Sequence, residues 1–325
     1  MPRFTFKRTA FIELLLLFVV CMGISILIAN RNQYLPDYQM YLSLYTYSSD
    51  IVEVSFNTIA SFFKSFTDNG FVYFLFFYAF LGFVLHMFFA YYYIKYEQGW
   101  LRFAIYLVPY FCYFFIFWDL IQIRYSAGIS FLLFGVFCNS RKWRFFFFVL
   151  AICFHNSMIL PEILFILYST IKKDYLKYLS MPLITMVAYI GLQYTRYSGK
   201  YEQSSAEWDH LNLLGGNCLM LYLLVCSLFY FRKKINERYA KQITALIFTV
   251  SVLAMLIVVL NTDYPAIANR LLALTLFLAF TCTAFIKDKY NLIFFLLISM
   301  VFSMWNFNII ILDPRSFFNT LWYHY

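Results

Sequence analysis

The chain has 325 residues, of which 63% are hydrophobic and 24% aromatic, and its formal net charge is +9 at pH 7. This composition excludes a water-soluble globular protein, and the length fits one membrane domain of about ten spans without a second soluble domain. The positive charge does not indicate nucleic-acid binding, because the basic residues lie in short segments at the ends of apolar runs. That arrangement is typical of membrane proteins that follow the positive-inside rule.

Long apolar runs predict membrane-spanning helices. A run of about 20 residues crosses roughly 30 Å of hydrocarbon at about 1.5 Å per residue, and the alternating segments of a closed barrel are missing. With a broken or re-entrant pair between residues 145 and 171, the sequence predicts an all-α polytopic protein of about 10–11 spans. Its single transmembrane domain covers residues 1–325. The other predicted spans are 10–29, 71–94, 103–118, 125–138, 178–195, 211–231, 243–260, 271–286 and 290–312.

The segment before the first span resembles a secretory signal peptide, since Arg3, Lys7 and Arg8 precede an apolar stretch. That stretch is about 20 residues long and has no A-x-A exit, whereas the apolar core of a signal peptide is shorter. We therefore expect an uncleaved first span.

Two short helices are predicted in the loop 30–70 that follows the first span. Pro36-Asp37-Tyr38, followed by Tyr41 and Tyr45, indicates the first, with Asp37 as a possible N-terminal cap. The second is an amphipathic helix in the membrane interface. It is indicated by apolar residues at spacings of four, three, four and three: Val52, Phe56, Ile59, Phe63 and Phe66.

The stretch 145–171 decides the topology. If it crosses the membrane once, Lys and Arg divide 12 to 13 between the two faces, whereas a chain that breaks near Phe154–Pro161 and returns places 18 on the N-terminal face and 7 on the other. The positive-inside rule selects the broken segment and a cytoplasmic N-terminus. Each half of about twelve residues covers only about 18 Å. Since irregular backbone at that depth must be enclosed by protein or line a water-filled cavity, we expect a cavity, with a kinked packing helix as the alternative.

The outer face carries ten of the sixteen acidic residues, among them Asp37, Glu53 and Asp209. The inner loops are short and basic, and the chain has neither a G-x-x-x-x-G-K nor a G-x-G-x-x-G motif. A cytosolic nucleotide substrate is therefore disfavoured. Outer-face loops 30–70 and 196–210 and an outer C-terminal segment 313–325 are the expected location of the chemistry.

Arg124 and His155 are the strongest single candidates. Arg124 lies at the outer entrance of a short span, where a charged side chain costs free energy and a guanidinium suits bidentate phosphate contacts; the simpler interpretation is a snorkelling side chain paired with Asp119. His155 lies at the predicted break beside Asn156 and Ser157, although a lone membrane histidine is often a packing residue. Glu162 is an ionisable group at a similar depth.

Weaker candidates complete the outer site. Arg270 opens a later span and either shares a diphosphate with Arg124 or pairs with Asp263. Glu53 has a simpler role as a solvated acid in the first turn of a helix. The loop 196–210 offers rings and acids, including Trp208 and Asp209, as a sugar platform.

The cysteines predict no metal site, disulfide or cofactor, because they lie within or beside predicted spans without a C-x-x-C or Cys/His cluster. They are Cys21, Cys112, Cys138, Cys153, Cys218, Cys226 and Cys282.

Four motifs, in order along nearly the whole chain, carry a resemblance to a known family. They are Asp37-Tyr38 with Tyr41, Ile123-Arg124 to Ala127, Phe154 to Ser157, and Asn269-Arg270. In these the chain resembles the EpsG-like, Wzy-type polymerases of bacterial O-antigen, capsule and exopolysaccharide. It departs from the family's E-P-G-F element, where it reads Glu53-Val54-Ser55-Phe56.

The resemblance implies a metal-independent, inverting glycosyltransferase of the GT-C type in the bacterial cytoplasmic membrane, with its active site on the periplasmic or outer face. It would polymerise oligosaccharide repeat units linked to undecaprenyl pyrophosphate, as in lipopolysaccharide biosynthesis, with a chain-length regulator as a further partner. Arg124 and Arg270 would stabilise the pyrophosphate, and Trp208, Asp209 and Tyr38 would contact sugar. His155, Asp37 or Glu53 would accept the proton of the acceptor hydroxyl.

Two alternatives remain. An outer-face glycan ligase or O-acyltransferase would share the lipid carrier but form no polymer. A flippase or other transporter would be expected to contain internal repeats and polar residues lining both half-channels. The sequence shows no internal repeat, and the inner half of its spans lacks intramembrane charges.

Overall fold

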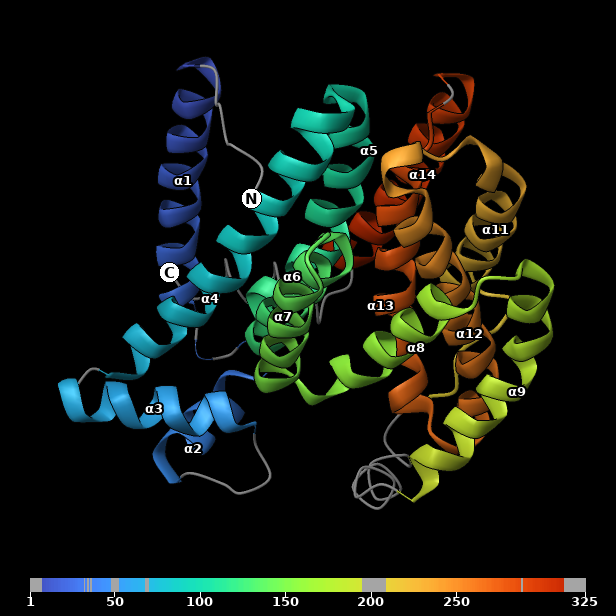
Figure 1. Ribbon diagram of the computed structural model, residues 1–325. Helices are drawn as coiled ribbons and strands as arrows, with labels where there is room; N and C mark the ends of the chain where they lie inside the picture. The colour runs from blue at the N-terminus through green and yellow to red at the C-terminus, as the bar shows by residue number, and fades with distance from the viewer. Residues whose placement is uncertain are drawn as a thin grey trace. The chain divides into compact units, whose positions relative to one another are not determined.

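The computed structural model describes residues 8–31, 33, 35, 37–47, 53–67, 70–194, 209–287 and 289–312 (Figure 1). Within these ranges the chain is helical, and the only bridge of β type is an isolated antiparallel one between Ile235 and Ile286. The predicted all-α polytopic class is confirmed. Residues 1–7, Val52, most of the loop 196–210 and the segment 313–325 lie outside the described residues.

The helices divide into two compact units, one built from residues 1–97, 111–159 and 305–325 and the other from 98–110 and 160–304. The first unit contains α1 (Arg8–Ala29), α2 (Tyr38–Tyr47), α3 (Val54–Phe66), α4 (Gly70–Phe89), the π-helices η1 (Ala90–Tyr96) and η3 (Ile116–Ile121), α6 (Ile123–Phe137), α7 (Arg141–Phe154) and the 3₁₀ turn η4 (Asn156–Met158). The second contains α5 (Trp100–Pro109), most of α8 (Ile159–Thr170), α9 (Asp174–Gln193), α11 (Gly216–Phe231), the 3₁₀ turns η5 (Arg232–Lys234) and η6 (Glu237–Tyr239), α12 (Ala240–Asp263) and α13 (Pro265–Thr283). The π-helix η2 (Tyr110–Phe114) and α14 (Lys289–Leu312) pass from one unit to the other.

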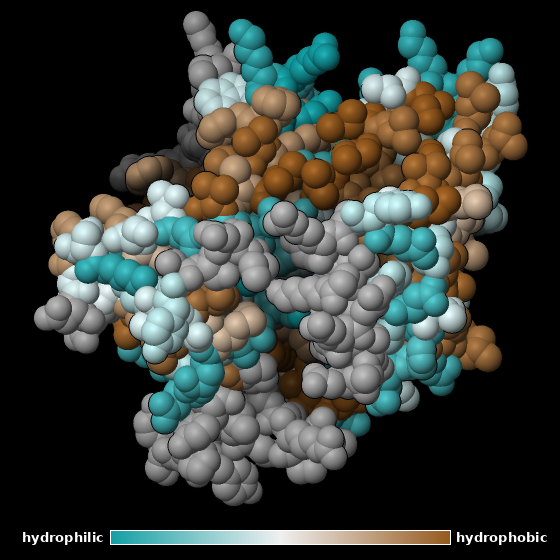
Figure 2. Space-filling model, turned by 90° about the horizontal axis from the view of Figure 1, so that it is seen from below, coloured by the Kyte–Doolittle hydropathy of each residue, from teal (hydrophilic) through white to brown (hydrophobic). Residues whose placement is uncertain are grey.

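Six helical stretches are long and apolar enough to cross a membrane, and two shorter apolar ones, 100–114 and 123–137, accompany them. Each of these eight stretches overlaps a predicted span, with ends that differ by up to six residues. The predicted span 211–231 corresponds to α11, a helix of 16 residues that is not among them. Exposed hydrophobic side chains, such as Leu183 and Met186 of α9, form the apolar surface that lipid would cover. Hydrophobic surface of this kind is visible in brown in Figure 2. The six long stretches are Phe11–Ala29, Gly70–Tyr96, Asp174–Gln193, Glu237–Asp263, Pro265–Thr283 and Tyr290–Ile310.

The predicted break in the stretch 145–171 is present. Helix α7 ends at Phe154, His155 is extended (φ −155°, ψ 115°), and α8 begins at Ile159 after a single 3₁₀ turn. Helices of 14 and 12 residues are each about 20 Å long, too short to cross the hydrocarbon core alone.

Small residues bring the helices of the first unit together. A Cβ atom on Gly82 of α4 would lie 2.6 Å from the Ser126 hydroxyl of α6, and one on Gly128 of α6 would lie 3.0 Å from the Cβ atom of His155. The Ser130 hydroxyl of α6 also donates to the Gly82 carbonyl at 2.9 Å. Close approach at small residues is the usual way in which membrane helices pack. It places the start of α6 beside both α4 and the break after α7.

The predicted helices of the outer loop are also present. Helices α2 and α3 lie beside the beginning of α4 (Figure 1), and aromatic rings join them: Phe56 contacts Phe74 at 4.8 Å and Tyr45 contacts Phe71 at 5.3 Å between ring centroids. The Ser55 hydroxyl donates to the Cys153 carbonyl at 2.6 Å. This bond fixes the start of α3 against the last turn of α7.

Candidate functional site

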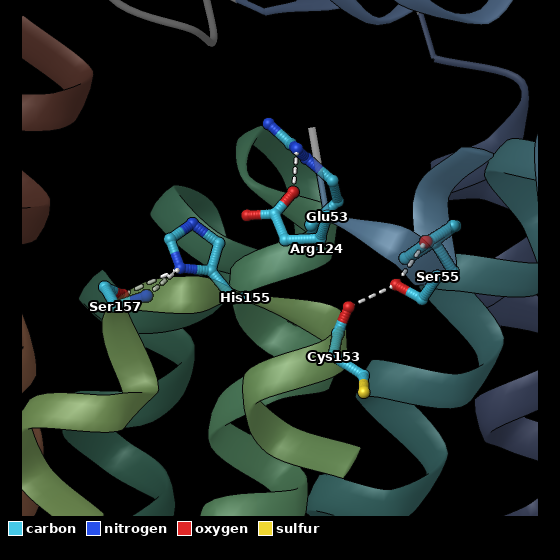
Figure 3. A network of polar contacts seen from close by, with 7 residues as sticks. Glu53, Ser55, Arg124, Cys153, His155 and Ser157 are labelled. Carbon is cyan, nitrogen blue, oxygen red and sulfur yellow. Dashed lines mark hydrogen bonds and ion pairs between the residues drawn. The ribbon is translucent and has the colours of Figure 1, made fainter. Parts of the chain in front are cut away.

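An ion pair that is largely shielded from solvent stands at the centre of the site. Arg124, in the first turn of α6, donates through Nη1 to Glu53 Oε2, the residue that immediately precedes α3 (Figure 3). Only 14% of the Arg124 side chain and 7% of that of Glu53 are exposed. The simpler interpretations of these two residues are therefore wrong: Glu53 is not a solvated acid, and Asp119 accepts a hydrogen bond from the Ser126 hydroxyl at 2.5 Å while Arg124 pairs with Glu53.

Aromatic rings enclose the Arg124 guanidinium. Its Cζ atom lies 5.4 Å from the centre of the Tyr41 ring and 5.2 Å from that of the Phe56 ring, within cation–π range. Its Nε–H group is buried and has no hydrogen-bond partner among the described residues. A buried ion pair is favourable only when its remaining polar atoms are satisfied, so this donor marks a place for an additional acceptor.

A second arginine lies at the same tyrosine. The Cζ atom of Arg31 is 5.5 Å from the centre of the Tyr41 ring, and Arg31 Nη1 donates to the Leu120 carbonyl at 2.6 Å. Burial raises the pKa of Tyr41, and the positive charges of Arg124 and Arg31 partly offset this rise. Burial likewise lowers the pKa of Arg31, against the opposing effects of Tyr41 and Asp37; an arginine remains charged at neutral pH.

Asp37 precedes α2 in a conformation that is unusual for a residue with a side chain. Its φ is +66°, in the left-handed region that aspartate tolerates better than most residues, and its carbonyl accepts from the Tyr41 N–H at 2.9 Å. This carbonyl starts α2, so Asp37 occupies the capping position through its backbone. Its carboxylate also acts electrostatically on Arg31 and Tyr41, which connects this predicted residue to the arginine cluster.

His155 occupies the break itself and its ring packs at 4.8 Å against Tyr125, the neighbour of Arg124. Nδ1 lies 3.3 Å from the Ser157 backbone nitrogen and 2.7 Å from the Ser157 hydroxyl (Figure 3). A backbone N–H can only donate, so Nδ1 accepts and the neutral ring carries its proton on Nε2. Towards a ligand, Nε2 is then a hydrogen-bond donor and not a base.

The remaining predicted residues divide between the two units. Tyr38, the first residue of α2, is half-buried and packs edge-on against Phe71 at 5.4 Å. Asp209 is exposed in the second unit, where the neighbouring His210 ring is bonded to the Asn261 carbonyl at 2.6 Å, and Trp208 lies outside the described residues.

Two charged candidates belong to the second unit. Arg270 is exposed on α13, and its partnership with Arg124 stays a prediction. Glu162, in the first turn of α8, is buried, with an Oε1 atom that has no partner among the described residues. In the described part of the chain, no group of three or more His, Cys, Asp and Glu side chains could hold a metal ion.

Sequence reasoning missed Arg31 and the Glu53–Arg124 pair. Arg31 follows the first span so closely that it resembles an ordinary flanking arginine, and the partners of the ion pair are 71 residues apart. One sequence signal could have pointed to Glu53. Where the family has E-P-G-F, this chain reads Glu53-Val54-Ser55-Phe56 and so keeps the acidic and the aromatic residue of that element.

Fold and site together define a multi-pass all-α membrane protein with a buried, arginine-rich polar cluster next to a broken helix. The sequence model of the EpsG family matches residues 14–325, and the chain belongs to this family. It is thereby a polysaccharide polymerase-like membrane protein of polysaccharide biosynthesis. No curated protein and no solved structure matches the chain.

Proposed function

We propose that this protein is a glycosyltransferase that polymerises oligosaccharide repeat units linked to undecaprenyl pyrophosphate. The reaction would take place on the outer face of the bacterial cytoplasmic membrane, with inversion and without a metal ion. The observation that carries the proposal is the guanidinium of Arg124, which lies among aromatic rings and has a buried, unpaired Nε–H group, in a chain that belongs to this family.

In the proposed reaction, a hydroxyl oxygen of the acceptor repeat unit attacks the anomeric carbon of the donor glycan. The bond from that carbon to the pyrophosphate oxygen breaks, and the pyrophosphate leaves with the electron pair and remains on the lipid carrier. The hydroxyl proton passes to a protein base. Fixed positive charge at the leaving oxygens stabilises this transition state, and Arg124 would supply it through the planar donor geometry that suits phosphate.

Glu53 is the preferred base. It contacts the guanidinium that we assign to the pyrophosphate, whereas the protonation pattern of His155 makes its Nε2 a donor. Pyrophosphate oxygens compete with the Glu53 carboxylate for the same guanidinium. Binding of the donor would therefore release Glu53 beside the reacting centre, where a carboxylate can accept the hydroxyl proton. His155 would donate to a substrate oxygen, and Asp37 would act on the arginines through its charge.

The test is incubation of the purified protein with its native lipid-linked repeat unit, with a chelator and no nucleotide sugar. We expect a ladder of repeat multiples. A single product in which the glycan has moved to another lipid would favour a ligase, and an unchanged repeat unit with folded protein would favour a transporter; either result contradicts the proposal.

A further inference from the structure

Arg31 is a buried arginine whose hydrogen-bonding capacity is only partly used. It lies two residues beyond the end of α1, and 7% of the residue is exposed. One of its N–H groups, on Nη1, donates to the Leu120 carbonyl in η3. Nε and Nη2 are buried and have no hydrogen-bond partner among the described residues.

Arg31 and Arg124 both lie beside the ring of Tyr41. The two guanidinium carbons lie 5.5 Å and 5.4 Å from the centre of the same ring, so they are no farther apart than the sum of these distances. Arg124 adds its own unpaired Nε. Three unpaired nitrogens from two guanidinium groups thus gather around one buried tyrosine, all within the first unit.

Unpaired buried donors are unfavourable, and more so when they are charged. Each carries a desolvation cost that a hydrogen-bond acceptor would recover. The nearby carboxylates do not provide it: Glu53 is bonded to Arg124 through Nη1, and the described carboxylates leave all three of these nitrogens unpaired. A diphosphate carries oxygen acceptors on two linked phosphorus atoms. It can therefore accept hydrogen bonds from two guanidinium groups, which a single carboxylate does less well.

We propose that Arg31 and Arg124 form one subsite for a diphosphate, in which Arg31 binds the phosphate group that Arg124 does not. This inference rests on the proposed function and adds to it a residue that sequence analysis did not select. It assigns the leaving-group contacts to two arginines of the first unit. A purely structural role for Arg31 would use only the bond to Leu120.

Arg31→Lys separates these two roles. A lysine can keep the positive charge and one bond to the Leu120 carbonyl, but it loses the planar set of donors. The experiment measures binding of inorganic pyrophosphate and of inorganic phosphate to the detergent-purified full chain by calorimetry, without metal. Arg102→Lys is the matched control, because the Arg102 guanidinium donates only to backbone carbonyls, those of Gln98, Ile286 and Lys287.

We expect wild-type protein and Arg102→Lys to bind pyrophosphate more tightly than phosphate. Arg31→Lys should bind pyrophosphate at least tenfold more weakly, lose most of the preference over phosphate and keep its melting temperature. If Arg31→Lys binds like wild type while Arg124→Lys does not, Arg31 is structural and the diphosphate subsite is wrong. The same holds if wild type shows no preference for pyrophosphate.

Failure of the broader proposal would look different. If wild type forms a repeat-unit ladder but binds no pyrophosphate, the two-arginine subsite is overturned while the polymerase function stands. If it neither forms a ladder nor binds pyrophosphate, both are overturned.

Discussion

Arginines with limited exposure occur in both units: Arg31 is buried, and Arg124 and Arg102 are partly buried. They differ in how their donors are used. In the second unit, Arg102 donates to three backbone carbonyls, with four hydrogen bonds between 2.7 and 3.0 Å. In the first unit, Arg31 donates to the Leu120 carbonyl and Arg124 to Glu53, and three buried nitrogens of these two side chains have no partner among the described residues. Arg102 hydrogen-bonds to backbone carbonyls just before α5 and just after α13. Arg31 and Arg124 instead have donors without a partner among the described residues. Buried donors without a partner distinguish Arg31 and Arg124, as candidate ligand-binding residues, from the structural Arg102.

The largest effect is expected from Glu53→Gln. Removal of a general base reduces turnover by roughly 10²–10⁴-fold, and the neutral amide competes less well than a carboxylate for Arg124. We therefore expect kcat for ladder formation to fall by about this factor, while pyrophosphate binding becomes tighter. A fall in both kcat and pyrophosphate affinity would show that Glu53 serves mainly to hold Arg124 in place.

A smaller effect is expected at His155, where two variants distinguish donor from base. His155→Gln can keep an N–H donor near the position of Nε2, and His155→Ala cannot. If Nε2 is a donor, kcat should fall about tenfold in the alanine variant, the loss of one hydrogen bond of about 1.5 kcal/mol, and little in the glutamine variant. Equal and large losses in both would restore His155 as the base.

The smallest effect on catalysis is expected from Arg102→Ala. Three carbonyls lose their donor, which costs about 1–3 kcal/mol of stability, but no group near Arg124 changes. We expect a lower melting temperature with kcat per folded molecule unchanged. Loss of kcat at constant melting temperature would contradict the division between the two kinds of arginine.

Much of the fold could be predicted from the sequence because membrane helices obey local rules. Apolar runs located most of the spans, with ends that differ by up to six residues, and the count of Lys and Arg alone indicated the break that the structure places at His155. The spacing of Phe56, Ile59 and Phe63 likewise predicted α3. These signals are contained in short stretches of chain, where length, hydropathy and charge act directly.

The site was less predictable because its contacts join distant segments. Arg124 has an acid nearby in sequence, Asp119, but the fold pairs it with Glu53 across 71 residues. The π-helix η3 was also missed. Its wide turn at Gln122, whose N–H bonds to the Phe117 carbonyl at 3.0 Å, immediately precedes α6, and the Leu120 carbonyl within it accepts from Arg31. Short π-helical turns often occur at functional sites, but the pattern of hydrophobic residues in a sequence does not predict where they form.

The most direct test compares ladder formation by Arg124→Lys and Arg102→Lys, in protein that melts at the wild-type temperature. Both substitutions keep a positive charge and remove the guanidinium, but only Arg124 is assigned to the leaving pyrophosphate. The proposed mechanism predicts that Arg124→Lys loses roughly 10²–10³-fold in kcat, as expected when a donor to developing negative charge is removed, and that Arg102→Lys loses none. Full activity in Arg124→Lys would contradict it.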